Sequence, residues 1–454
     1  MASPASSVEL LCLFERLIPP ALLADLIPQR GAGSGKGIFS FAVVIWLMIV
    51  QRLHAKGTLS SALQQLLQIR PGNLLPDCKR VRDGNISSHP GGYCQARHNM
   101  PTLVARKVCD HIVAQLQAEL PLCPEGCSQP VFLLDGSSLE LAHTEELAAA
   151  YPPAENQHGA AHWPILRIAV MHNLANGLAL RPSWGPMSGP DAVSEQGLAE
   201  TLMDRLPPGA VIVGDRNFGV FSVVYAARAK GFPVVLRLTK ERFQRVWNGT
   251  ADRGQDRPVK WLASRSDRTR HPDLPPQASV AGRILVAQMQ SGSATEFLYL
   301  FTTLELPAEQ ILEIYRCRWR IETDLRSVKA TIRLHHIPAK TSAMVEKEIL
   351  IAITAYNMVR AVMGWAAQQA GISPRSLSFS HVQDVVEAAL PMLAAAPSTE
   401  EYAFHFHRML NYAARCKLPN RSHRRTFPRT IWGHHQSFPK RKAAPHLSSQ
   451  EKTI

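Results

Sequence analysis

The sequence predicts an α/β fold in which helices cover a mixed sheet. Two apolar runs of strand length, residues 131–135 and 211–215, each end in an aspartate. Helix-like segments separate these runs from each other and from a third apolar run at residues 233–238. Strands that alternate with helices in this way are typical of a layered α/β domain.

The first 122 residues predict a helical N-terminal domain. Helices are expected at residues 8–26, 39–56, 59–68 and 102–120. The most hydrophobic stretch, residues 39–50, is too short at about a dozen residues to span a bilayer, so we expect a buried helix and no membrane partner. The sequence leaves open whether this domain binds a ligand or is a lid packed on the core.

The core is expected within residues 128–375. Its expected elements are a strand to residue 135, a hairpin of residues 165–174 and 178–184, a helix at 194–206, a strand to 215, a helix at 220–230 and a strand at 233–238. The dipeptide Asn176-Gly177 is a strong turn signal for the hairpin.

Residues 240–295 interrupt this core. The stretch 240–294 is polar, holds four prolines and carries ten Lys or Arg against five Asp or Glu. It is too long for an ordinary loop, so we expect an inserted, strand-rich subdomain. Residues 297–303 then return as a strand.

The helix that follows the insertion carries the strongest functional signal. Tyr315, Arg318, Glu322 and Lys329 lie at roughly 0°, 300°, 340° and 320° around it, a stripe about 60° wide beside an apolar stripe. A surface ladder of salt bridges has similar spacing, so the helix alone leaves that alternative open. Asp324 is predicted to lie on the far side, away from the stripe.

Two aspartates at strand ends add the context. A single aspartate there is more often a cap than a catalyst, but Asp135 and Asp215 precede Glu322 in the order that a three-carboxylate site requires. Small, hard Mg²⁺ prefers oxygen ligands, and Mn²⁺ accepts the same donors. Two such ions about 4 Å apart promote in-line phosphoryl transfer, so we predict that Asp135, Asp215 and Glu322 hold two Mg²⁺ or Mn²⁺ ions.

The three carboxylates resemble the D-D-E triad of cut-and-paste transposases. The series Tyr315-x2-Arg318-x3-Glu322-x6-Lys329 is similar to the signature of the insertion-sequence-four family of bacterial transposases, and all four positions match. The resemblance implies an RNase H-like catalytic core with an insertion between the second aspartate and the glutamate. These two residues are 107 positions apart here, which leaves room for it.

The resemblance also implies an activity and partners. A transposase of this family cleaves DNA at the ends of an insertion sequence and joins the freed 3′-hydroxyl to target DNA. The implied partners are double-stranded DNA of the terminal inverted repeats, target DNA and a second subunit, giving a homodimer on DNA. The N-terminal domain would help to bind the element ends.

Further residues are expected to contact DNA. Tyr315, Arg318 and Lys329 would hold phosphates near the cut, and Arg326 and Arg333, at about 20° and 0°, would extend that line. If the flanking end passes through a hairpin, Trp247 or Trp261 of the insertion could stack on a flipped base. Each of these tryptophans fits the subdomain core equally well.

Residues 376–454 are expected to form a C-terminal helical region and a basic tail. The chain has a formal charge of +14, and residues 402–450 contain ten Lys or Arg and no Asp or Glu. Such a tail is typical of a nucleic-acid contact surface, or else of a solvated tail without a partner. Eight cysteines without paired metal spacing and no secretory signal favour a reducing cytoplasm. The resemblance implies that this is a bacterial cytoplasm, with association to the nucleoid.

Two rival functions remain compatible with the sequence. A metal-dependent nuclease on the same fold would cut DNA without joining strands. An inactive, transposase-derived DNA-binding protein would lack a metal ligand, and all three carboxylates are present here.

Overall fold

The computed structural model describes residues 37–419 apart from short gaps, together with Ile18 and Leu22. The gaps are residues 55–56, 70–74, 76–77, 157–158, 248–254, 292–293 and 397. By its internal contacts the chain divides into residues 1–417 and residues 418–454, and every element below lies in the first unit. Apart from Ile18 and Leu22, the helix expected at residues 8–26 lies outside the described residues, as does the basic tail from residue 420 onward.

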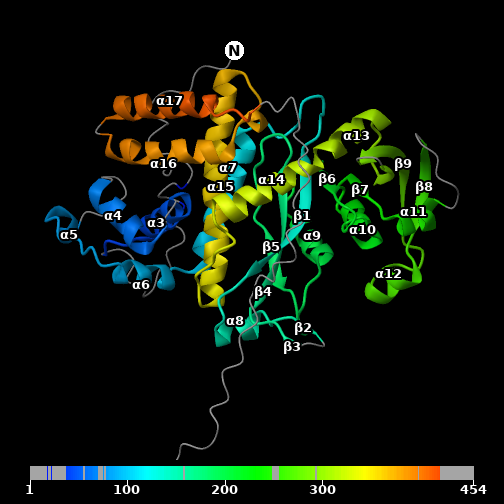
Figure 1. The fold of residues 1–454 in the computed structure, drawn as a ribbon, viewed down its shortest axis with the longest axis horizontal. Helices are drawn as coiled ribbons and strands as arrows, with labels where there is room; N and C mark the ends of the chain where they lie inside the picture. The colour runs from blue at the N-terminus through cyan, green and yellow to red at the C-terminus, as the bar shows by residue number, and fades with distance from the viewer. Residues whose placement is uncertain are drawn as a thin grey trace, which may run out of the picture. The chain divides into compact units, whose positions relative to one another are not determined.

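An eight-stranded mixed sheet organises the first unit (Figure 1), in the order β5-β4-β1-β6-β7-β10-β9-β8. The strands are β1 (Val131–Glu140), β4 (Ile165–Asn173), β5 (Ser183–Pro186), β6 (Val211–Gly214), β7 (Val234–Arg237), β8 (Asp256–Leu262), β9 (Ser279–Ser291) and β10 (Ala294–Thr302). Neighbours β1, β6 and β7 run parallel, and all other neighbours run antiparallel. The predicted mixed α/β fold is confirmed.

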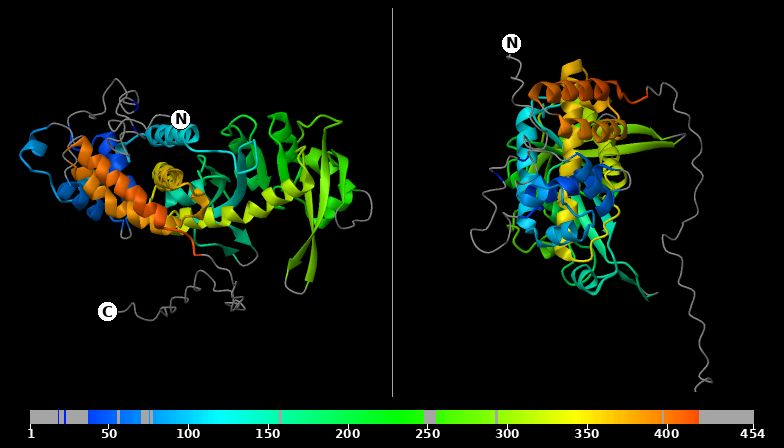
Figure 2. Two further views of the ribbon diagram at one scale, coloured as in Figure 1. Left: turned by 90° about the horizontal axis from the view of Figure 1, so that it is seen from above. Right: turned by 90° about the vertical axis from the view of Figure 1, so that its left-hand side faces the viewer.

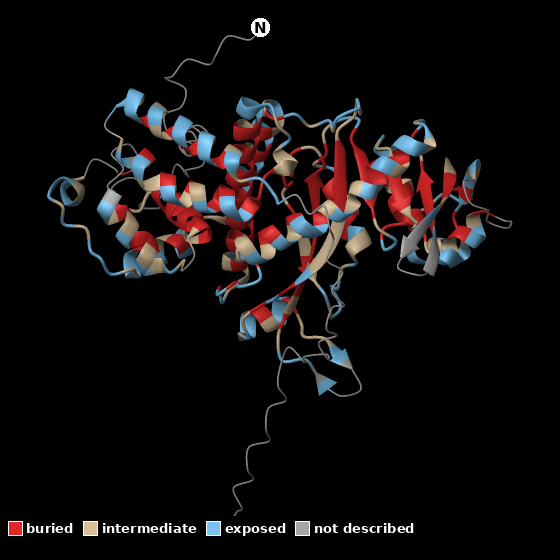
Figure 3. Cartoon of the chain, turned by 45° about the horizontal axis from the view of Figure 1, so that its top comes forward, coloured by how far each residue is buried: buried red, intermediate tan, exposed pale blue. Residues whose placement is uncertain are grey.

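The parallel strands are short apolar runs because both faces of the sheet are covered there. All four residues of β6 are buried, and the β-branched residues that dominate β6 and β7 fit a pleated, enclosed surface. Figure 3 shows the buried colour concentrated in the central strands and on the inner sides of the helices. The core therefore lies on the strands that carry the two aspartates.

Strand β1 does not end at Asp135, as the sequence had suggested. It continues to Glu140 because β4 pairs with it antiparallel from Phe132 to Glu140. On its other side the parallel partner β6 stops at Gly214. Asp135 therefore lies where the neighbouring strand β6 ends. From this point on, β1 has a strand neighbour on the β4 side but, among the described residues, none on the β6 side.

The predicted hairpin turn is present, but its second strand begins later than expected. Gly177 has a φ of 85°, which glycine adopts without strain, and β5 begins at Ser183 instead of residue 178. The backbone of Ala179 instead exchanges two hydrogen bonds, 2.9 and 2.8 Å long, with the side-chain amide of Asn357. Backbone hydrogen bonds from Asn173 to Leu178 and from Leu180 to Met171, with a single bridge between His172 and Ala179, still join this stretch to β4, while a side chain from a distant helix holds Ala179.

The insertion is strand-rich, as predicted, and it extends the core sheet. Strand β10 pairs with β7, and β9 and β8 follow outward. Two short helices, α11 (Lys240–Trp247) and α12 (Arg265–Arg270), accompany the strands. Backbone pairing through β10 therefore attaches the insertion to the sheet that carries Asp215.

Two helices predicted between the core strands are confirmed. Helix α9 (Glu195–Met203) begins after Ser194, whose hydroxyl accepts a hydrogen bond from the Gly197 amide. It packs on β4 and β5, and α10 (Phe221–Ala229) packs beside it. Nearby lie α8 (Glu145–Ala150) and a small ribbon of β2 (Glu155–Asn156) and β3 (Gly159–Ala160).

A long helix, α15 (Ser342–Ala370), binds the helical parts to one another (Figure 2). Around it pack α3 (Phe41–Leu53), α7 (Thr102–Glu119), α16 (Phe379–Ala395) and α17 (Thr399–Arg415), while α4 (Leu59–Ile69), α5 (Lys79–Arg82) and α6 (Gly91–Asn99) complete the described N-terminal helices. Helix α15 is long and apolar enough to cross a membrane by composition, but 94% of its apolar window is buried inside the protein. Its hydrophobicity is explained by packing.

A buried ion cluster ties the N-terminal helices to α15. Glu348 of α15 pairs with both Arg52 of α3 and Arg97 of α6, and the side chains of all three are at most 11% exposed. Beside it the Lys347 ammonium donates to the carbonyls of Arg97, His98 and Met100, which close the C-terminal end of α6. The described residues up to 417 form one contact unit, and the predicted domain boundaries at residues 122 and 375 stay predictions.

We predict that Glu348→Gln lowers the free energy of unfolding by about 3–5 kcal/mol, because it leaves two buried guanidinium groups without a counter-charge. The matched control is Glu346→Gln on the same helix, whose pair with Arg106 is more exposed and should cost at most about 1 kcal/mol. Chemical denaturation of both variants measures the difference. Equal losses would show that the cluster does not hold the N-terminal helices.

Candidate active site

Asp135 and Asp215 lie side by side at the end of the parallel strand pair. Leu134 of β1 pairs with Gly214 of β6, and each aspartate is the next residue along its chain. Adjacent strands are about 4.8 Å apart, so the two carboxylates leave neighbouring backbones at the same edge. The backbone amide of Gly136 donates to Asp135 Oδ1 at 2.8 Å, and the amide of Asn217 donates to Asp215 Oδ1 at 2.8 Å.

The surroundings of this edge raise the pKa of Asp135. Burial raises the pKa of Asp135 to about 6, and the nearby negative charges of Asp215 and Glu195 add to the increase. The Gly136 amide and the Arg318 guanidinium oppose it without cancelling it. A cation bound at this edge would relieve the repulsion.

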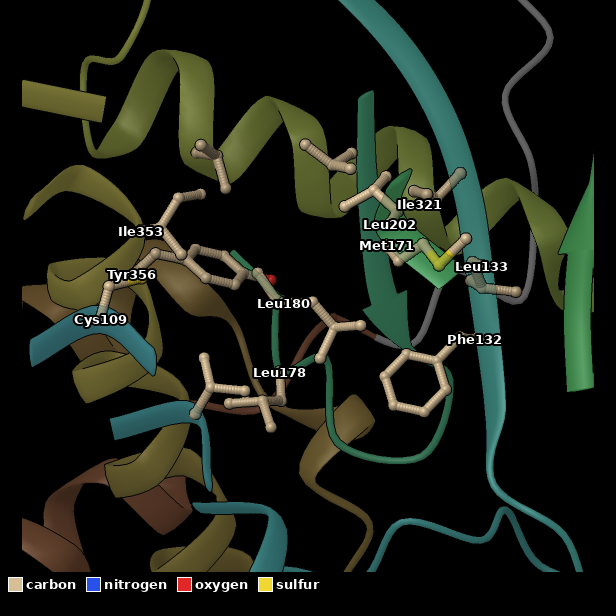
Figure 4. Packing of buried hydrophobic residues seen from close by; sticks show 14 of the residues in the cluster. Cys109, Phe132, Leu133, Met171, Leu178, Leu180, Leu202, Ile321, Ile353 and Tyr356 are labelled. Carbon is tan, nitrogen blue, oxygen red and sulfur yellow. The ribbon is translucent and has the colours of Figure 1, made fainter. Parts of the chain in front are cut away.

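The helix that carries the signature is continuous but irregular. It runs as α13 (Ala308–Arg316), a 3-10 turn (Cys317–Trp319), α14 (Arg320–Arg326) and a π turn (Ser327–Thr331). Its apolar side faces the core as predicted, and Figure 4 shows Ile321 reaching from α14 toward β1, where Leu133 lies. The helix therefore lies against the strand that carries Asp135.

Arg318 is the central cation of the site. Its Nη2 donates to Glu322 Oε1 at 2.9 Å. Burial lowers the pKa of Arg318, but the hydrogen bond to Glu322 and the negative charges of Glu322 and Asp135 outweigh burial and raise it. The negative charge of Asp135 thus acts on Arg318, while the direct contact of Arg318 is with Glu322.

Glu322 itself is largely exposed, with 58% of its side chain accessible. Among the described residues, no three His, Cys, Asp or Glu side chains lie close enough together to hold one ion. The structure therefore brings together Asp135 and Asp215, and it places Glu322 apart from them, bonded to Arg318.

Tyr315 completes the buried side of the site. The residue is 7% exposed, and its hydroxyl finds no hydrogen-bond partner in the described part of the chain. Burial raises the pKa of Tyr315 to about 12, while the charges of Arg318 and Arg237 act in the opposite direction. A neutral hydroxyl donor is therefore left facing the charged cluster.

Lys329 also reaches the strand of the first aspartate. Its Nζ donates to Ser137 Oγ at 3.0 Å and to the Ser138 carbonyl at 3.2 Å. Arg326 is exposed at the end of α14. Arg318 thus bonds Glu322, Lys329 binds the strand of Asp135, Tyr315 is buried beside Arg318, and Arg326 is exposed on the same helix.

Arg333 differs from the expectation. Its guanidinium donates to the Gln51 carbonyl of α3, and its own carbonyl accepts from Arg52. The reason is backbone geometry: the π turn changes the rotation per residue, and Arg333 has a φ of 59°, which ends the helix. A constant angle of 100° per residue could not place it.

Asp324 lies away from the polar stripe, as predicted, and is buried. It pairs with Arg360 of α15 and with Arg375, which lies in the 3-10 turn Pro374–Ser376. Burial acts to raise the pKa of Asp324, but the two arginine charges outweigh it and hold the pKa below its usual value. Asp324 is an anchor of the helix.

Both tryptophans considered for stacking on a flipped base are core residues. Trp247 is 2% exposed and Trp261 is 7% exposed. Arg257 stacks on the Trp247 ring at 4.0 Å, and Trp261 packs edge-on against Phe301. The exposed aromatic ring near the carboxylates is Trp319, at 56%, which directly follows Arg318.

Sequence reasoning missed two residues of this edge. Glu195 lies over Gly136 and accepts a hydrogen bond from Asn217. Arg237 is the last residue of β7, and its positive charge acts to lower the pKa of Tyr315. A serine followed by an acidic residue is an ordinary helix start, so Glu195 gave no separate signal. A positive charge at the end of the apolar run 233–238 was the available signal for Arg237.

The fold and the paired aspartates define the class: an RNase H-like core whose carboxylates meet at the end of parallel strands. Comparison with known families agrees, because the family model for the transposase DDE domain matches residues 126–358. The chain belongs to the DDE transposase family. Its activity is, at the family level, DNA transposition by phosphoryl transfer.

The chain is also similar to an individual transposase. The transposase InsG for insertion sequence element IS4 of Escherichia coli (strain K12) is 24% identical over 425 residues, which cover 91% of this chain and 90% of the relative. The resemblance to insertion-sequence-four transposases is thereby confirmed. The match extends beyond the catalytic core into the helical regions on both sides.

We predict that the metal-free protein loses stability as the pH rises from about 4 to about 6. The raised pKa of Asp135 means that the folded state holds a proton that the unfolded state has already released in this range. Asp135→Asn removes this titration and should flatten the fall, as measured by thermal unfolding in chelator at several pH values. An unchanged pH profile in the variant would refute the burial of this charge.

Proposed function

We propose that this protein cuts DNA at the ends of an insertion sequence and joins the freed 3′-hydroxyl to target DNA. The observation that carries the proposal is the register that sets Asp135 beside Asp215, with Arg318 bonded to Glu322 on the helix that packs against β1. This arrangement gathers carboxylates and one guanidinium at a single edge of the sheet. It suits a reaction in which phosphate charge must be held and balanced.

The donor set fits divalent Mg²⁺ or Mn²⁺. Asp135, Asp215 and Glu322 offer only hard oxygen atoms, and the pKa of Asp135 is raised by burial and, to a smaller extent, by the charges of Asp215 and Glu195, which a bound cation would offset. We propose that these three residues hold two ions, Glu322 exchanging its contact with Arg318. Bound ions would activate the attacking hydroxyl and stabilise the leaving oxygen.

The remaining residues of the helix would hold the DNA backbone. Arg318 offers a planar fork for a phosphate once Glu322 turns away, and Lys329 offers a point charge beside β1. The Tyr315 hydroxyl is a buried donor in need of an acceptor. Arg326 and Trp319, both exposed, would extend the contact to the next phosphate and to a base or sugar face. Arg333 is omitted because its guanidinium binds the Gln51 carbonyl.

The proposed partners are double-stranded DNA of the terminal inverted repeats and of the target. The net charge of +14 favours binding to DNA, and Lys79, Arg80 and Arg82 expose three positive charges on the short helix α5 of the N-terminal region. We propose that this region grips the element ends, that the DNA complex is a homodimer and that the protein works in the bacterial cytoplasm on nucleoid DNA.

We predict that Asp135→Asn, Asp215→Asn and Glu322→Gln each abolish DNA cutting with Mg²⁺ and leave DNA affinity within about threefold, because they remove ion ligands and no phosphate contact. Cleavage of DNA containing the element ends, run beside a binding assay, measures both effects. The matched control is Glu313→Gln on the same helix, whose ion pair with Arg316 is 73% exposed and which should cut normally.

Two outcomes would change the assignment. Normal cutting by Glu322→Gln would remove Glu322 from the site. Cutting by the parent protein without any joined product in the presence of target DNA would favour a nuclease without strand transfer.

We predict that Arg318→Ala and Lys329→Ala weaken DNA binding and that each lowers the slope of log affinity against log salt by about 0.9, the effect of one lost phosphate contact. Arg316→Ala, the exposed neighbour on the same helix, serves as the control. Binding isotherms at four or more salt concentrations give the slopes. Slopes equal to that of the parent would place both side chains away from the DNA backbone.

A further inference from the structure

Glu195 is the one acidic side chain at the edge of the two aspartates that the three-carboxylate scheme does not use. It is the first residue of α9, a helix packed on β4 and β5. Its carboxylate lies over Gly136, the residue after Asp135. A Cβ atom on residue 136 would stand only 2.5 and 2.6 Å from the two Glu195 carboxylate oxygens. Glycine at this position is therefore what allows the carboxylate to approach β1.

The same carboxylate is coupled to the second aspartate. Asn217 donates its side-chain amide to Glu195 Oε2 and its backbone amide to Asp215 Oδ1, the latter at 2.8 Å. Gln196 in turn donates to the Asn217 carbonyl at 2.9 Å and to its side-chain oxygen at 3.0 Å. One asparagine thus fixes Glu195 and Asp215 relative to each other.

This arrangement leaves binding capacity unused. Among the described residues, Glu195 Oε1 accepts no hydrogen bond, and Glu195 has no salt bridge, although Arg167 lies nearby and donates to the Val193 carbonyl. Strand β6 ends at Gly214, directly before Asp215. From the helix side, the buried and unpartnered Tyr315 hydroxyl faces the same edge.

We propose that Glu195 is a fourth carboxylate of the divalent-cation site, its side chain turning toward Asp135 and Asp215 when the ion binds, because among the described residues no three such side chains lie close enough together without this movement. The inference rests on the proposed metal-dependent function. Glu195 approaches from α9, opposite the signature helix, so the cation would be enclosed from both sides of the strand ends. A carboxylate from this side also explains why the edge holds acidic groups in excess of the arginines that face them.

The test is a titration of the full-length protein with Mn²⁺ alone, in which electron paramagnetic resonance measures the free ion. Glu195→Gln keeps the size of the side chain and an acceptor for Asn217, and we expect it to raise the Mn²⁺ dissociation constant about tenfold or more. Gly136→Ala, which pushes the carboxylate away, should have the same effect. Glu200→Gln, on the same helix and similarly half-buried, should leave the dissociation constant unchanged.

Thermal unfolding separates ligand from scaffold. A ligand role predicts that Glu195→Gln unfolds at the parent's temperature or above it without metal, and gains less stability than the parent when Mn²⁺ is added. A purely structural role predicts a lower unfolding temperature without metal and an unchanged gain. If Glu195→Gln folds poorly, Glu195→Asp retracts the carboxylate while keeping its charge, and should still weaken Mn²⁺ binding.

The outcomes distinguish this inference from the proposed function. If Asp135→Asn weakens Mn²⁺ binding and Glu195→Gln leaves it within twofold of the parent, Glu195 is not a ligand and the three-carboxylate site stands. If neither change has an effect, or the parent binds no Mn²⁺, the cation site of the proposed function fails together with this inference.

Discussion

The ion pairs of Asp324 are the interaction on which the site depends. This carboxylate is 1% exposed and receives hydrogen bonds from Arg360 of α15 and Arg375. Arg375 also binds the carbonyls of Asn173 and Leu174 at the end of β4. The helix that carries Glu322, α15 and the central sheet therefore meet at one buried charge. Because removing one partner of a buried pair costs several kcal/mol, the helix cannot slide along β1 without losing it.

Asp324 fixes the helix from the side opposite Glu322, so the side that carries Glu322 is not used for anchoring. Two residues before Asp324, Glu322 faces solvent and Arg318, so the anchor determines where both groups stand without using them. On the sheet, Asp135 and Asp215 are positioned by strand register, with no need for a buried partner. Burial, together with the negative charges of Asp215 and Glu195, raises the pKa of Asp135, a cost that functional sites accept and that a bound cation would offset.

Sequence patterns predicted those features that depend on local chemistry. The strands of Asp135 and Asp215 are apolar runs, and the polar stripe of the helix follows from regular spacing. The core strands and the pair of aspartates could therefore be predicted from the sequence. The late start of β5 could not, because the Asn357 amide that holds the backbone of Ala179 lies about 180 residues away. The role of Glu195 was hidden for a similar reason: its contact with Gly136 exists only after α9 packs on the sheet.

The irregular helix explains why most of the predicted stripe survived and its last member did not. A 3-10 turn rotates by about 120° per residue instead of about 100°, so Cys317–Trp319 advances the stripe. The wider π turn at Ser327–Thr331 is underwound and turns it back. These opposite changes keep Lys329 on the side of β1, where it binds Ser137. Beyond them the helix ends at Arg333, whose guanidinium binds α3. The π turn that directs Lys329 to β1 therefore also separates the edge that carries Asp135 and Asp215 from the contact with the N-terminal helices.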